Sequence, residues 1–284
     1  MIHVVIPVFN RLSLTKACIK SLKKQKNCET INIIIVDDGS TDGTTAYFKK
    51  FFPEIKIIKG TGELYWGGSI KVGIDYVIKI AKKNDWLLIV NNDVSLCFNT
   101  VSELIKLSNY YKRNALVSSI SIDAKDKKTI IKTGTIVKSW FFNTTVHLFQ
   151  NMNFTKLKKK DPVEVDIFTG RCLLHPIEIF KKIGNYNSNY FMHYGGDDEF
   201  SMRAKRYGFK NLLCLNSKVF LHNNVVTKYR DKNIKNFFYF LFNKKSSSNL
   251  IDKIKITIKI VPFYAKASYL FIGIIKSIHI FFKK

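Results

Sequence analysis

Three short apolar runs in the first 90 residues limit the fold more than any other feature of this sequence. They occupy residues 2–8, 31–36 and 86–90, and each ends in polar or glycine-bearing residues. Between the first two runs, apolar residues recur at intervals of three and four, which predicts an amphipathic helix over residues 13–24. Strands that alternate with helices predict the α/β class, with a mostly parallel central sheet flanked by helices.

The polar residues that follow these runs should meet at one edge of that sheet. In open parallel sheets, ligands bind beyond the carboxyl ends of the strands. The three ends read Pro7-Val8-Phe9-Asn10, Asp37-Asp38-Gly39-Ser40 and Asn91-Asn92-Asp93. An aspartate in the second of these could accept hydrogen bonds from a nucleotide base or ribose. Asp37 or Asp42 could equally cap the helix that follows.

Asp93 is the residue in these strand ends that points to a metal. An almost wholly apolar strand delivers three consecutive polar side chains there, and burying them without ligands would be costly. Hard divalent cations combine a few protein oxygens with phosphate oxygens, which one aspartate beside a diphosphate can supply. The alternative is an ordinary strand-end turn rich in asparagine and aspartate.

A third polar element lies in residues 194–203, where a glycine-bearing loop leads into a helix. Asp197, Asp198 and Glu199 fall in its first turn. Acids at a helix N-terminus are ordinary partners of the helix dipole. Crowded carboxylates can also include one that is positioned as a general base. Both interpretations remain open at this point.

The rest of the first 227 residues gives weaker signals. Residues 115–160 mix short β-like runs with a lysine cluster at 156–160, and we interpret them as an acceptor-side region with a flexible loop. A strand or turn is expected at 165–174 and a helix at 176–182. We expect one main domain over residues 1–227 and a basic, aromatic-rich helical tail over residues 228–284.

Charge and cysteine usage narrow the functional classes. Lys and Arg total 47 against 21 Asp and Glu, a formal charge of +26, which indicates a polyanionic partner. The basic residues are spread and no nucleic-acid-binding motif spacing appears, so we expect no nucleic-acid partner. The five cysteines are odd in number and widely spaced, and no signal peptide precedes them. We therefore expect free thiols in a reducing cytoplasm.

Taken together, the motifs resemble those of family 2 glycosyltransferases with the GT-A fold. Within that family they are similar to the bacterial, rhamnosyltransferase-like branch that builds surface polysaccharides. The resemblance covers about residues 1–225, and its parts stand in family order: VIPVFNR, VDDGSTDGT, GELYWGGSIKVGI, NND, FTGRCLL, GGDDEFSMRAKRYG and the lone His222. It implies a nucleotide-sugar-binding GT-A domain.

The resemblance also implies roles for individual residues. It places Pro7, Phe9, Asn10 and Asp38 at the nucleotide base and ribose, and Trp66 and Gly67 in a loop that closes beside them. Core packing is an equal alternative role for Trp66. Gly67 could instead be an ordinary turn residue. The residues in the position of the family's DxD motif are Asn91, Asn92 and Asp93. Because an asparagine replaces the first acid, Asp93 becomes the chief metal ligand, with Asn91 beside it and Asn92 facing the donor.

By the same resemblance, His222 is a late metal ligand, although a lone histidine after an apolar strand is more often structural. Asp197 is the base that deprotonates the acceptor hydroxyl, with Asp198 as its alternate. The implied reaction is an inverting transfer, dependent on Mn²⁺ or Mg²⁺, from a nucleotide-diphosphate sugar to a saccharide or lipid-linked saccharide acceptor. The donor sugar, its nucleotide and the acceptor linkage stay open.

Two other enzyme classes fit the sequence less well. A sugar nucleotidyltransferase normally carries a glycine-rich basic loop after its first strand, and a dinucleotide-dependent oxidoreductase carries GxGxxG there. Here the first strand leads into Pro7-Val8-Phe9-Asn10. The nucleotidyltransferase is the closer alternative of the two.

The tail from residue 228 alternates basic residues with Phe, Tyr, Ile and Leu, and its acids are nearly limited to Asp231 and Asp252. Residues 260–282 reach spanning length but contain Pro262 and three basic or imidazole side chains, which disfavours a transmembrane helix. We expect helices that lie in the plane of an anionic membrane surface, on its inner, cytoplasmic face. Packing on the catalytic domain or a homo-oligomer contact is the alternative.

Overall fold

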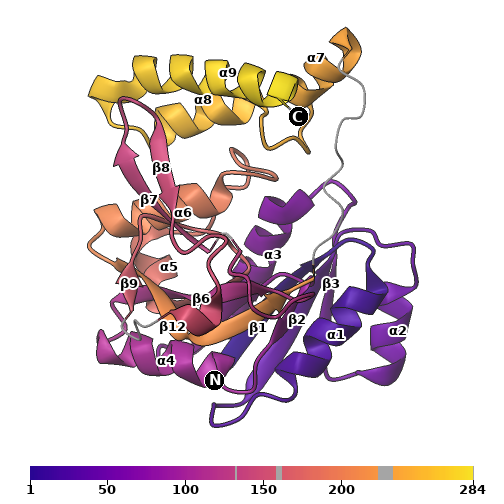
Figure 1. The fold of residues 1–284 in the computed structure, drawn as a ribbon. Coiled ribbons are helices and arrows are strands. Elements are labelled where there is room, and N and C mark those ends of the chain that lie inside the picture. The colour runs from indigo at the N-terminus through magenta and orange to yellow at the C-terminus, as the bar shows by residue number, and fades with distance from the viewer. Residues whose placement is uncertain (132, 158–161, 223–232, 284) are drawn as a thin grey trace.

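The computed structural model describes residues 1–131, 133–157, 162–222 and 233–283. Within these ranges the chain forms a nine-stranded sheet in the order β3-β2-β1-β4-β11-β6-β12-β5, with β9 paired to β12 (Figure 1). Its strands are β1 (Ile2–Val8), β2 (Ile31–Asp37), β3 (Lys56–Lys59), β4 (Trp86–Val90), β5 (Val94–Leu96), β6 (Ala115–Asp123), β9 (Val163–Glu164), β11 (Cys172–Pro176) and β12 (Lys210–Leu221). A smaller sheet joins β7 (Gly134–Ser139), β8 (Thr144–His147) and β10 (Ile167–Phe168).

The three predicted apolar runs are β1, β2 and β4, and they pair in parallel as expected. β3 extends this parallel set beside β2. β11 then runs antiparallel between β4 and β6, so the sheet as a whole is mixed. β1 and β4 are apolar along nearly their whole length because helices cover both faces of the sheet.

Helices cover both faces of the large sheet. Side chains alternate along β1, so that Val4 and Ile6 pack towards one helical layer and Val5 towards the other. The first layer holds α1 (Leu12–Leu22), α2 (Thr44–Phe51) and α4 (Thr100–Tyr110). The second holds α3 (Tyr65–Ile80), α5 (Glu178–Ile183) and α6 (Gly196–Arg206). This arrangement confirms the α/β class.

Local boundaries differ from the sequence prediction in three places. The helix expected over residues 13–24 is α1, which begins at Leu12 and ends at Leu22. The expected helix at residues 176–182 is α5, which begins only at Glu178, because Pro176 is the last residue of β11 and pairs with Trp86. The expected strand or turn at 165–174 is two strands, β10 and β11, in different sheets. The middle region contains β6, β7, β8 and the short helix η1 (Phe154–Lys156). Most of the lysine cluster at 156–160 lies outside the described residues.

The tail is helical, as predicted. It contains α7 (Ile234–Phe242), α8 (Leu250–Lys259), the short helix η2 (Phe263–Ala265) and α9 (Lys266–Lys283). Phe240, Leu241 and Phe281 form a small apolar cluster between α7 and α9. The predicted domain boundary at 227/228 lies outside the described residues. Among those that are described, one helical stretch, Phe263–Lys283, is long and apolar enough to cross a membrane.

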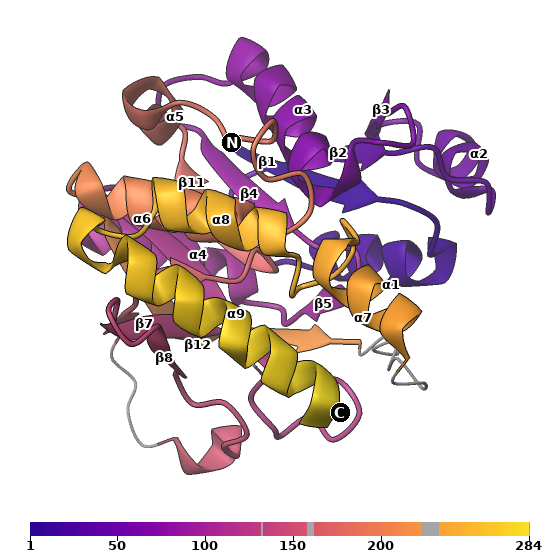
Figure 2. The same ribbon diagram turned by 90° about the horizontal axis from the view of Figure 1, so that it is seen from above.

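The tail helices also pack on the catalytic part of the chain. Lys255 Nζ of α8 donates to the Tyr190 carbonyl at 2.7 Å, and Arg206 at the end of α6 donates to the Lys259 carbonyl at 2.9 Å. Asn143, at the tip of the β7–β8 hairpin, donates to the Tyr269 carbonyl of α9 at 3.1 Å. Figure 2 shows α8 and α9 crossing over α6 and this hairpin. Packing on the main domain, one of the two alternatives for the tail, therefore occurs.

Candidate active site

The loops that follow β1 and β2 are bound to each other at the carboxyl edge of the sheet. The Asn10 backbone N–H donates to Ser40 Oγ at 2.7 Å, and the Thr41 N–H donates to Asn10 Oδ1 at 2.9 Å. Asn10 has a positive φ of 56°, which lets the chain turn sharply after the strand. Pro7 lies near the end of β1, and the Phe9 side chain beyond it is 51% exposed. These residues occupy the edge at which donor binding is predicted.

The aspartates after β2 divide between local and long-range contacts. Asp37 Oδ1 accepts the Ser40 N–H at 2.9 Å, and Asp42 Oδ1 accepts the Thr44 N–H at 3.2 Å at the start of α2. Asp37 and Asp42 thus stabilise the local turn and the helix start, which was the alternative interpretation of this motif. Asp42 Oδ2 also accepts the Leu12 N–H at the start of α1, at 2.7 Å.

Asp38, unlike Asp37, makes its side-chain hydrogen bonds to a distant segment, the loop that leads into α3. Its buried carboxylate accepts the Gly62 N–H at 2.8 Å through Oδ1 and the Tyr65 N–H at 2.9 Å through Oδ2. Gly60 allows this approach, since a Cβ atom there would lie 2.6 Å from Asp38 Oδ1. The structure therefore places Asp38 under the Gly60–Tyr65 loop.

Trp66 and Gly67, in the first turn of α3, connect this loop to two other motifs. Trp66 Nε1 donates to Asn91 Oδ1 at 2.9 Å, which brings the indole to the end of β4. The Gly67 N–H donates to the Met192 carbonyl at 2.7 Å, and a Cβ on Gly67 would lie 2.1 Å from the Phe191 carbonyl oxygen. Only glycine permits this backbone contact. Trp66 also packs edge-to-face against Tyr186, so it serves core packing as well.

The three polar residues after β4 point in different directions. Asn91 contacts Trp66, whereas Asn92 is buried and donates from Nδ2 to Thr15 Oγ1 of α1 at 3.1 Å. The chain turns at Asn92 and Asp93 between β4 and β5, with the Val94 N–H donating to the Asn91 carbonyl at 3.4 Å, so these side chains leave the backbone in different directions. The structure thus places the Asn92 side chain in the packing of α1, away from Trp66.

Asp93 combines one paired oxygen with one unpaired oxygen. Its Oδ2 lies 3.7 Å from Arg11 Nη1, while its Oδ1 is buried with no hydrogen-bond partner among the described residues. Burial raises the pKa of the Asp93 carboxyl, and the positive charges of Arg11 and Arg171 oppose that rise. A buried carboxylate oxygen without a donor is suited to a cation.

The His222 backbone lies beside that of Asp93. Its backbone N–H donates to the Asp93 carbonyl at 2.9 Å, directly after the antiparallel pairing of β12 with β5. The imidazole Nε2 is 2.8 Å from Ser95 Oγ. The described residues contain no group of three His, Cys, Asp or Glu side chains that could hold an ion. A divalent cation at Asp93 and His222 would therefore take further ligands from phosphate oxygens or water, and Asp93 Oδ1 fits that coordination.

Asp197 approaches the same region from the start of α6. Its Oδ2 accepts the Gly170 N–H at 2.9 Å, and a Cβ on Gly170 would lie 2.5 Å from the Trp66 ring. Trp66 and Asp197 therefore meet across Gly170. This loop binds Asp197 to the residues that precede β11.

Arg171 is a site residue that sequence reasoning missed. Its guanidinium interacts electrostatically with both Asp93 and Asp197, and burial lowers its pKa against the effect of these two acids. It thus links the predicted metal ligand to the predicted base. The signal was present in FTGRCLL, where one arginine directly precedes an apolar strand, but nothing local indicated which acids it would meet.

The other two acids of α6 have separate environments. Glu199 is buried and its Oε1 accepts from Arg203 Nε at 2.8 Å, one helical turn later, which is a structural ion pair. Asp198 faces the tail: burial and the Asp198 charge together raise the pKa of Tyr269 in α9 to about 12. Asp197 is the acid of this turn that is joined to Gly170, Arg171 and, across Gly170, Trp66.

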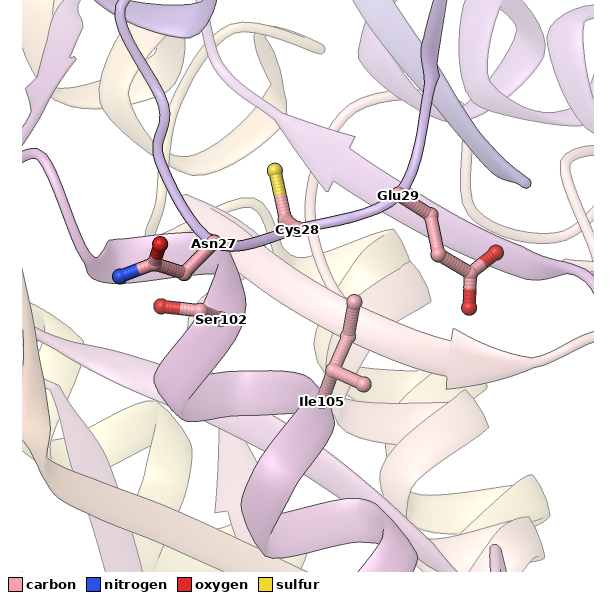
Figure 3. A pocket seen from close by; sticks show the side chains of 5 residues that line it. All are labelled: Asn27, Cys28, Glu29, Ser102 and Ile105. Carbon is pink, nitrogen blue, oxygen red and sulfur yellow. The ribbon is translucent and has the colours of Figure 1, made fainter.

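A surface depression elsewhere contains none of these residues. It is lined by residues before β2 and on α4: Asn27, Cys28, Glu29, Ser102 and Ile105 (Figure 3). Residues before β2 lie at the amino end of the parallel strands, opposite to the edge that carries the motifs. Cys28 and the other four cysteines are free, as expected.

Comparison with known proteins agrees with this arrangement. A family model described as glycosyl transferase family 2 matches residues 3–184. The N-acetylglucosaminyl-diphospho-decaprenol L-rhamnosyltransferase of Mycobacterium tuberculosis is 21% identical over 220 residues, which cover 71% of this chain and 69% of that protein. The dolichyl-phosphate beta-glucosyltransferase of Saccharomyces cerevisiae is 30% identical over 141 residues, which cover 45% of this chain and 37% of that one.

Solved structures share the fold. A crystal structure of GalNAc-T7 with UDP, GalNAc and Mn2+ superposes with a TM-score of 0.68 at 14% identity and covers 95% of this chain. A crystal structure of S. aureus TarS superposes with a TM-score of 0.57 at 13% identity and covers 97% of this chain. This chain spans about half the length of each, 50% and 53% respectively. The architecture common to them is the GT-A fold.

Proposed function

Because the chain belongs to glycosyltransferase family 2, we propose that it is an inverting, divalent-metal-dependent enzyme that transfers a sugar from a nucleotide-diphosphate donor to a saccharide acceptor. The observation that carries this proposal is the placement of Asp93 and Asp197. Asp93 presents a buried, unpartnered oxygen beside His222, and Arg171 interacts with both Asp93 and Asp197. A metal side and a base side are thus held together at the carboxyl edge of the sheet.

The chain's own residues divide the chemistry between those two sides. Asp93 and His222 would hold Mn²⁺ or Mg²⁺, with Asn91 as a further oxygen ligand, and such an ion neutralises charge on a departing diphosphate. Trp66 and the loop that Asp38 holds would border the nucleotide. Asp197 would accept the proton of the acceptor hydroxyl as that oxygen attacks the anomeric carbon from the face opposite the leaving group. One displacement without a covalent enzyme intermediate inverts the configuration.

A lipid-linked acceptor is the next part of the proposal, with surface polysaccharide as its product. The mycobacterial relative is named for a diphospho-decaprenol acceptor, and the yeast relative for dolichyl phosphate. The tail suits such a substrate, since its helices α7, α8, η2 and α9 expose a broad set of apolar side chains: Ile234, Phe238, Ile251, Ile254, Ile258, Phe263, Phe271, Ile275 and Phe282. Asp252 is the one acid among the many lysines of residues 233–283. Apolar side chains beside lysines favour docking on the anionic cytoplasmic face of a membrane.

The direct test is a screen of nucleotide sugars for donor hydrolysis, with Mn²⁺, with Mg²⁺ and with excess EDTA. We expect one donor class to release its nucleoside diphosphate when the metal is present and to be spared in EDTA. Full activity in EDTA would refute the metal dependence. Release of pyrophosphate from a nucleoside triphosphate and a sugar phosphate would instead identify a nucleotidyltransferase.

A further inference from the structure

The loop before α6 is held between α3 on one side and the tail helix α8 on the other. From α3, the Gly67 N–H donates to the Met192 carbonyl at 2.7 Å. From α8, Lys255 Nζ donates to the Tyr190 carbonyl at 2.7 Å, and Lys259 Nζ lies 4.7 Å from the centre of the Tyr190 ring. The loop is therefore supported both by the domain core and by a helix that lies beyond the family match.

Ile256 of α8 reaches the point at which α6 begins. Gly195 directly precedes α6 and has a φ of 86°, and a Cβ atom on it would lie 3.2 Å from Ile256 Cδ1 and 2.9 Å from Phe191 Cδ1. The glycine thus lets both side chains pack close to the backbone of this turn. At the other end of the helix, Arg206 donates to the Lys259 carbonyl of α8 at 2.9 Å. α8 consequently contacts both ends of α6 (Figure 2).

The start of α6 matters because Asp197 is its second residue. The Gly195 carbonyl accepts the Glu199 N–H at 2.9 Å, so the first helical turn, which contains Asp197, is built on Gly195. The Gly170 N–H fixes one oxygen of the Asp197 carboxylate, at 2.9 Å. A shift of Gly195 would therefore move the Asp197 backbone and turn its carboxylate about that bond. Misplacing a reacting group by about 1 Å can lower a rate about 10²-fold.

We propose that α8 positions the general base: Ile256 and Lys255 fix the loop before α6, and thereby the carboxylate of Asp197. This inference rests on the proposed function, in which Asp197 takes the proton of the attacking hydroxyl. Ile256 and Lys255 are positioning residues, because they act on the loop and not on the substrate. The C-terminal tail then sets the rate of the chemical step, in addition to any contact with a membrane.

The expected signature is a loss of rate at unchanged donor affinity. Asp38 is bonded to the loop before α3, and Asp93 lies in the turn between β4 and β5, so both belong to segments other than α6 and α8. Loosening α8 should therefore spare the proposed donor and metal side. A change at Gly67, on the opposite side of the loop, should lower donor affinity as well, because it also moves Trp66.

Two isoleucines of α8 give a matched test in the full-length chain. Ile256→Ala removes the methyl group near Gly195, whereas Ile258→Ala makes the same change at a side chain that is 54% exposed. The rate is the release of nucleoside diphosphate, with Mn²⁺, from whichever of a set of UDP-, GDP- and dTDP-sugars the wild type hydrolyses. In that reaction water replaces the acceptor hydroxyl, attacks the anomeric carbon and gives its proton to Asp197. Titration calorimetry with the same nucleoside diphosphate and Mn²⁺ measures affinity.

We expect Ile256→Ala to lower kcat roughly tenfold while affinity stays within about twofold. Ile258→Ala should match the wild type in both. Lys255→Met, which removes the hydrogen bond to the Tyr190 carbonyl, should lower kcat about threefold, the scale of one such bond. Lys255→Arg can donate to the same carbonyl and should restore the rate.

A double substitution tests whether α8 acts through the base. Ile256→Ala should have little further effect on the rate of Asp197→Asn, because the effects of residues that act through one group are not additive. Melting temperatures above the assay temperature for every variant ensure that the rates belong to the folded chain.

The outcomes separate this inference from the proposed function. Equal kcat values for Ile256→Ala and Ile258→Ala would overturn the role of α8 and leave the transferase proposal standing. A full tenfold loss from Ile256→Ala in the Asp197→Asn chain, or a loss of affinity in place of rate, would do the same. A wild type that hydrolyses no nucleotide sugar and binds no nucleoside diphosphate with Mn²⁺ would overturn both.

Discussion

At the residue scale, the unpartnered oxygen of Asp93 predicts opposite effects on stability and on activity. Asp93→Asn should raise the melting temperature in EDTA, because it removes a buried charge whose desolvation is only partly offset by Arg11. The gain should be on the order of 1 kcal/mol. The same variant, and Asp93→Ala, should lose transfer and metal-dependent donor binding while remaining folded.

Asp85 is the matched control for that measurement. Its carboxylate accepts the Lys82 N–H at 2.7 Å and lies 3.2 Å from His3 Nε2, and these contacts help to lower its pKa to about 2. Asp85→Asn should therefore lower the melting temperature. Mn²⁺ should stabilise the wild type and Asp85→Asn, but not Asp93→Asn. Unchanged transfer by Asp93→Ala would remove this residue from the metal site.

The base assignment predicts a difference between neighbouring acids. Asp197→Asn keeps an oxygen that can accept the Gly170 N–H, but it cannot take up a proton. We expect transfer to fall by about 10²- to 10⁴-fold with donor affinity retained. Asp198→Asn should be far milder, since that side chain faces Tyr269 of the tail. If Asp198→Asn is the inactive variant, the base lies one residue later than proposed. Lost donor affinity in Asp197→Asn would make Asp197 a donor contact.

His175 predicts how stability responds to acid. It is fully buried on β11, its Nε2 lies 3.1 Å from the Tyr186 hydroxyl, and burial lowers its pKa to about 3. An unfolded chain protonates this histidine near pH 6.5, whereas the folded chain does so only near pH 3. The unfolded state therefore binds more protons between those values, and stability falls as the pH drops below 6.5.

The expected contribution of His175 is about 2 kcal/mol between pH 7 and pH 5. Urea unfolding at the two pH values measures it. His175→Gln should flatten the pH dependence, even though it also lowers the stability at pH 7 by disturbing the packing. Burial also lowers the pKa of His193, so this residue also makes the protein less stable as the pH falls. The same measurement on His193→Gln gives its part of the pH dependence. An unaltered pH slope in His175→Gln would contradict the assignment.

At the scale of elements, α3 contacts the loop before α6 through Gly67. This contact joins Trp66, on the proposed donor side, to the segment that leads into Asp197, the proposed base. Gly67→Ala would place a Cβ atom 2.1 Å from the Phe191 carbonyl oxygen, so the two backbones must separate. We expect a loss of roughly 1–3 kcal/mol of stability, the range for overpacking a close contact. Donor affinity and transfer should both fall, because Trp66 moves with this turn.

Gly68→Ala is the control on the same turn of α3. Its Cβ would meet only the Leu64 side chain, at 3.1 Å, which can shift by a few tenths of an ångström. Alanine also favours the helix. Thermal unfolding and donor binding should therefore change little in Gly68→Ala. Equal effects of the two substitutions would show that the contact with Phe191 is not what matters.

At the scale of the whole molecule, the exposed face of α9 predicts binding to anionic membranes. Phe271 is 65% exposed and Ile275 is 49% exposed, on a helix whose other side packs on α8 and the β7–β8 hairpin. The full-length chain should float with phosphatidylglycerol-containing vesicles at low salt. Phe271→Asp with Ile275→Asp should abolish flotation, since each acid opposes both burial and the negative surface.

Tyr110→Asp is the control for that assay, because Tyr110 is 80% exposed on α4, far from the tail in the sequence. Its flotation should match that of the wild type. Transfer to a soluble acceptor analogue should be kept by the α9 variant, because neither substituted side chain is part of the proposed site. Flotation of the α9 variant equal to that of wild type would refute the membrane role and leave the transferase proposal intact. The point substitutions leave the contact between α8 and Tyr190 intact, whereas removal of the tail would eliminate it.

The sequence by itself determined the order and type of the first elements and the family. Runs such as residues 2–8 and 86–90 show their strand character in local composition, and the strand-end motifs stand in a recognisable order. Parallel pairing then places those ends at one edge, so the neighbourhood of Asp38, Asn91 and Asp93 could be predicted. The helical tail was predicted from its mixture of basic and apolar residues, and α7, α8 and α9 confirm that it is helical.

Only the tertiary structure decided which side chains meet at that edge. Arg171 lies far along the chain from Asp93, so no local pattern could pair the two. Asn92 turned towards Thr15 of α1, although it stands in a motif that implies a ligand. The physical reason is that periodicity records whether a residue is buried, whereas its partner depends on how separate elements pack against each other.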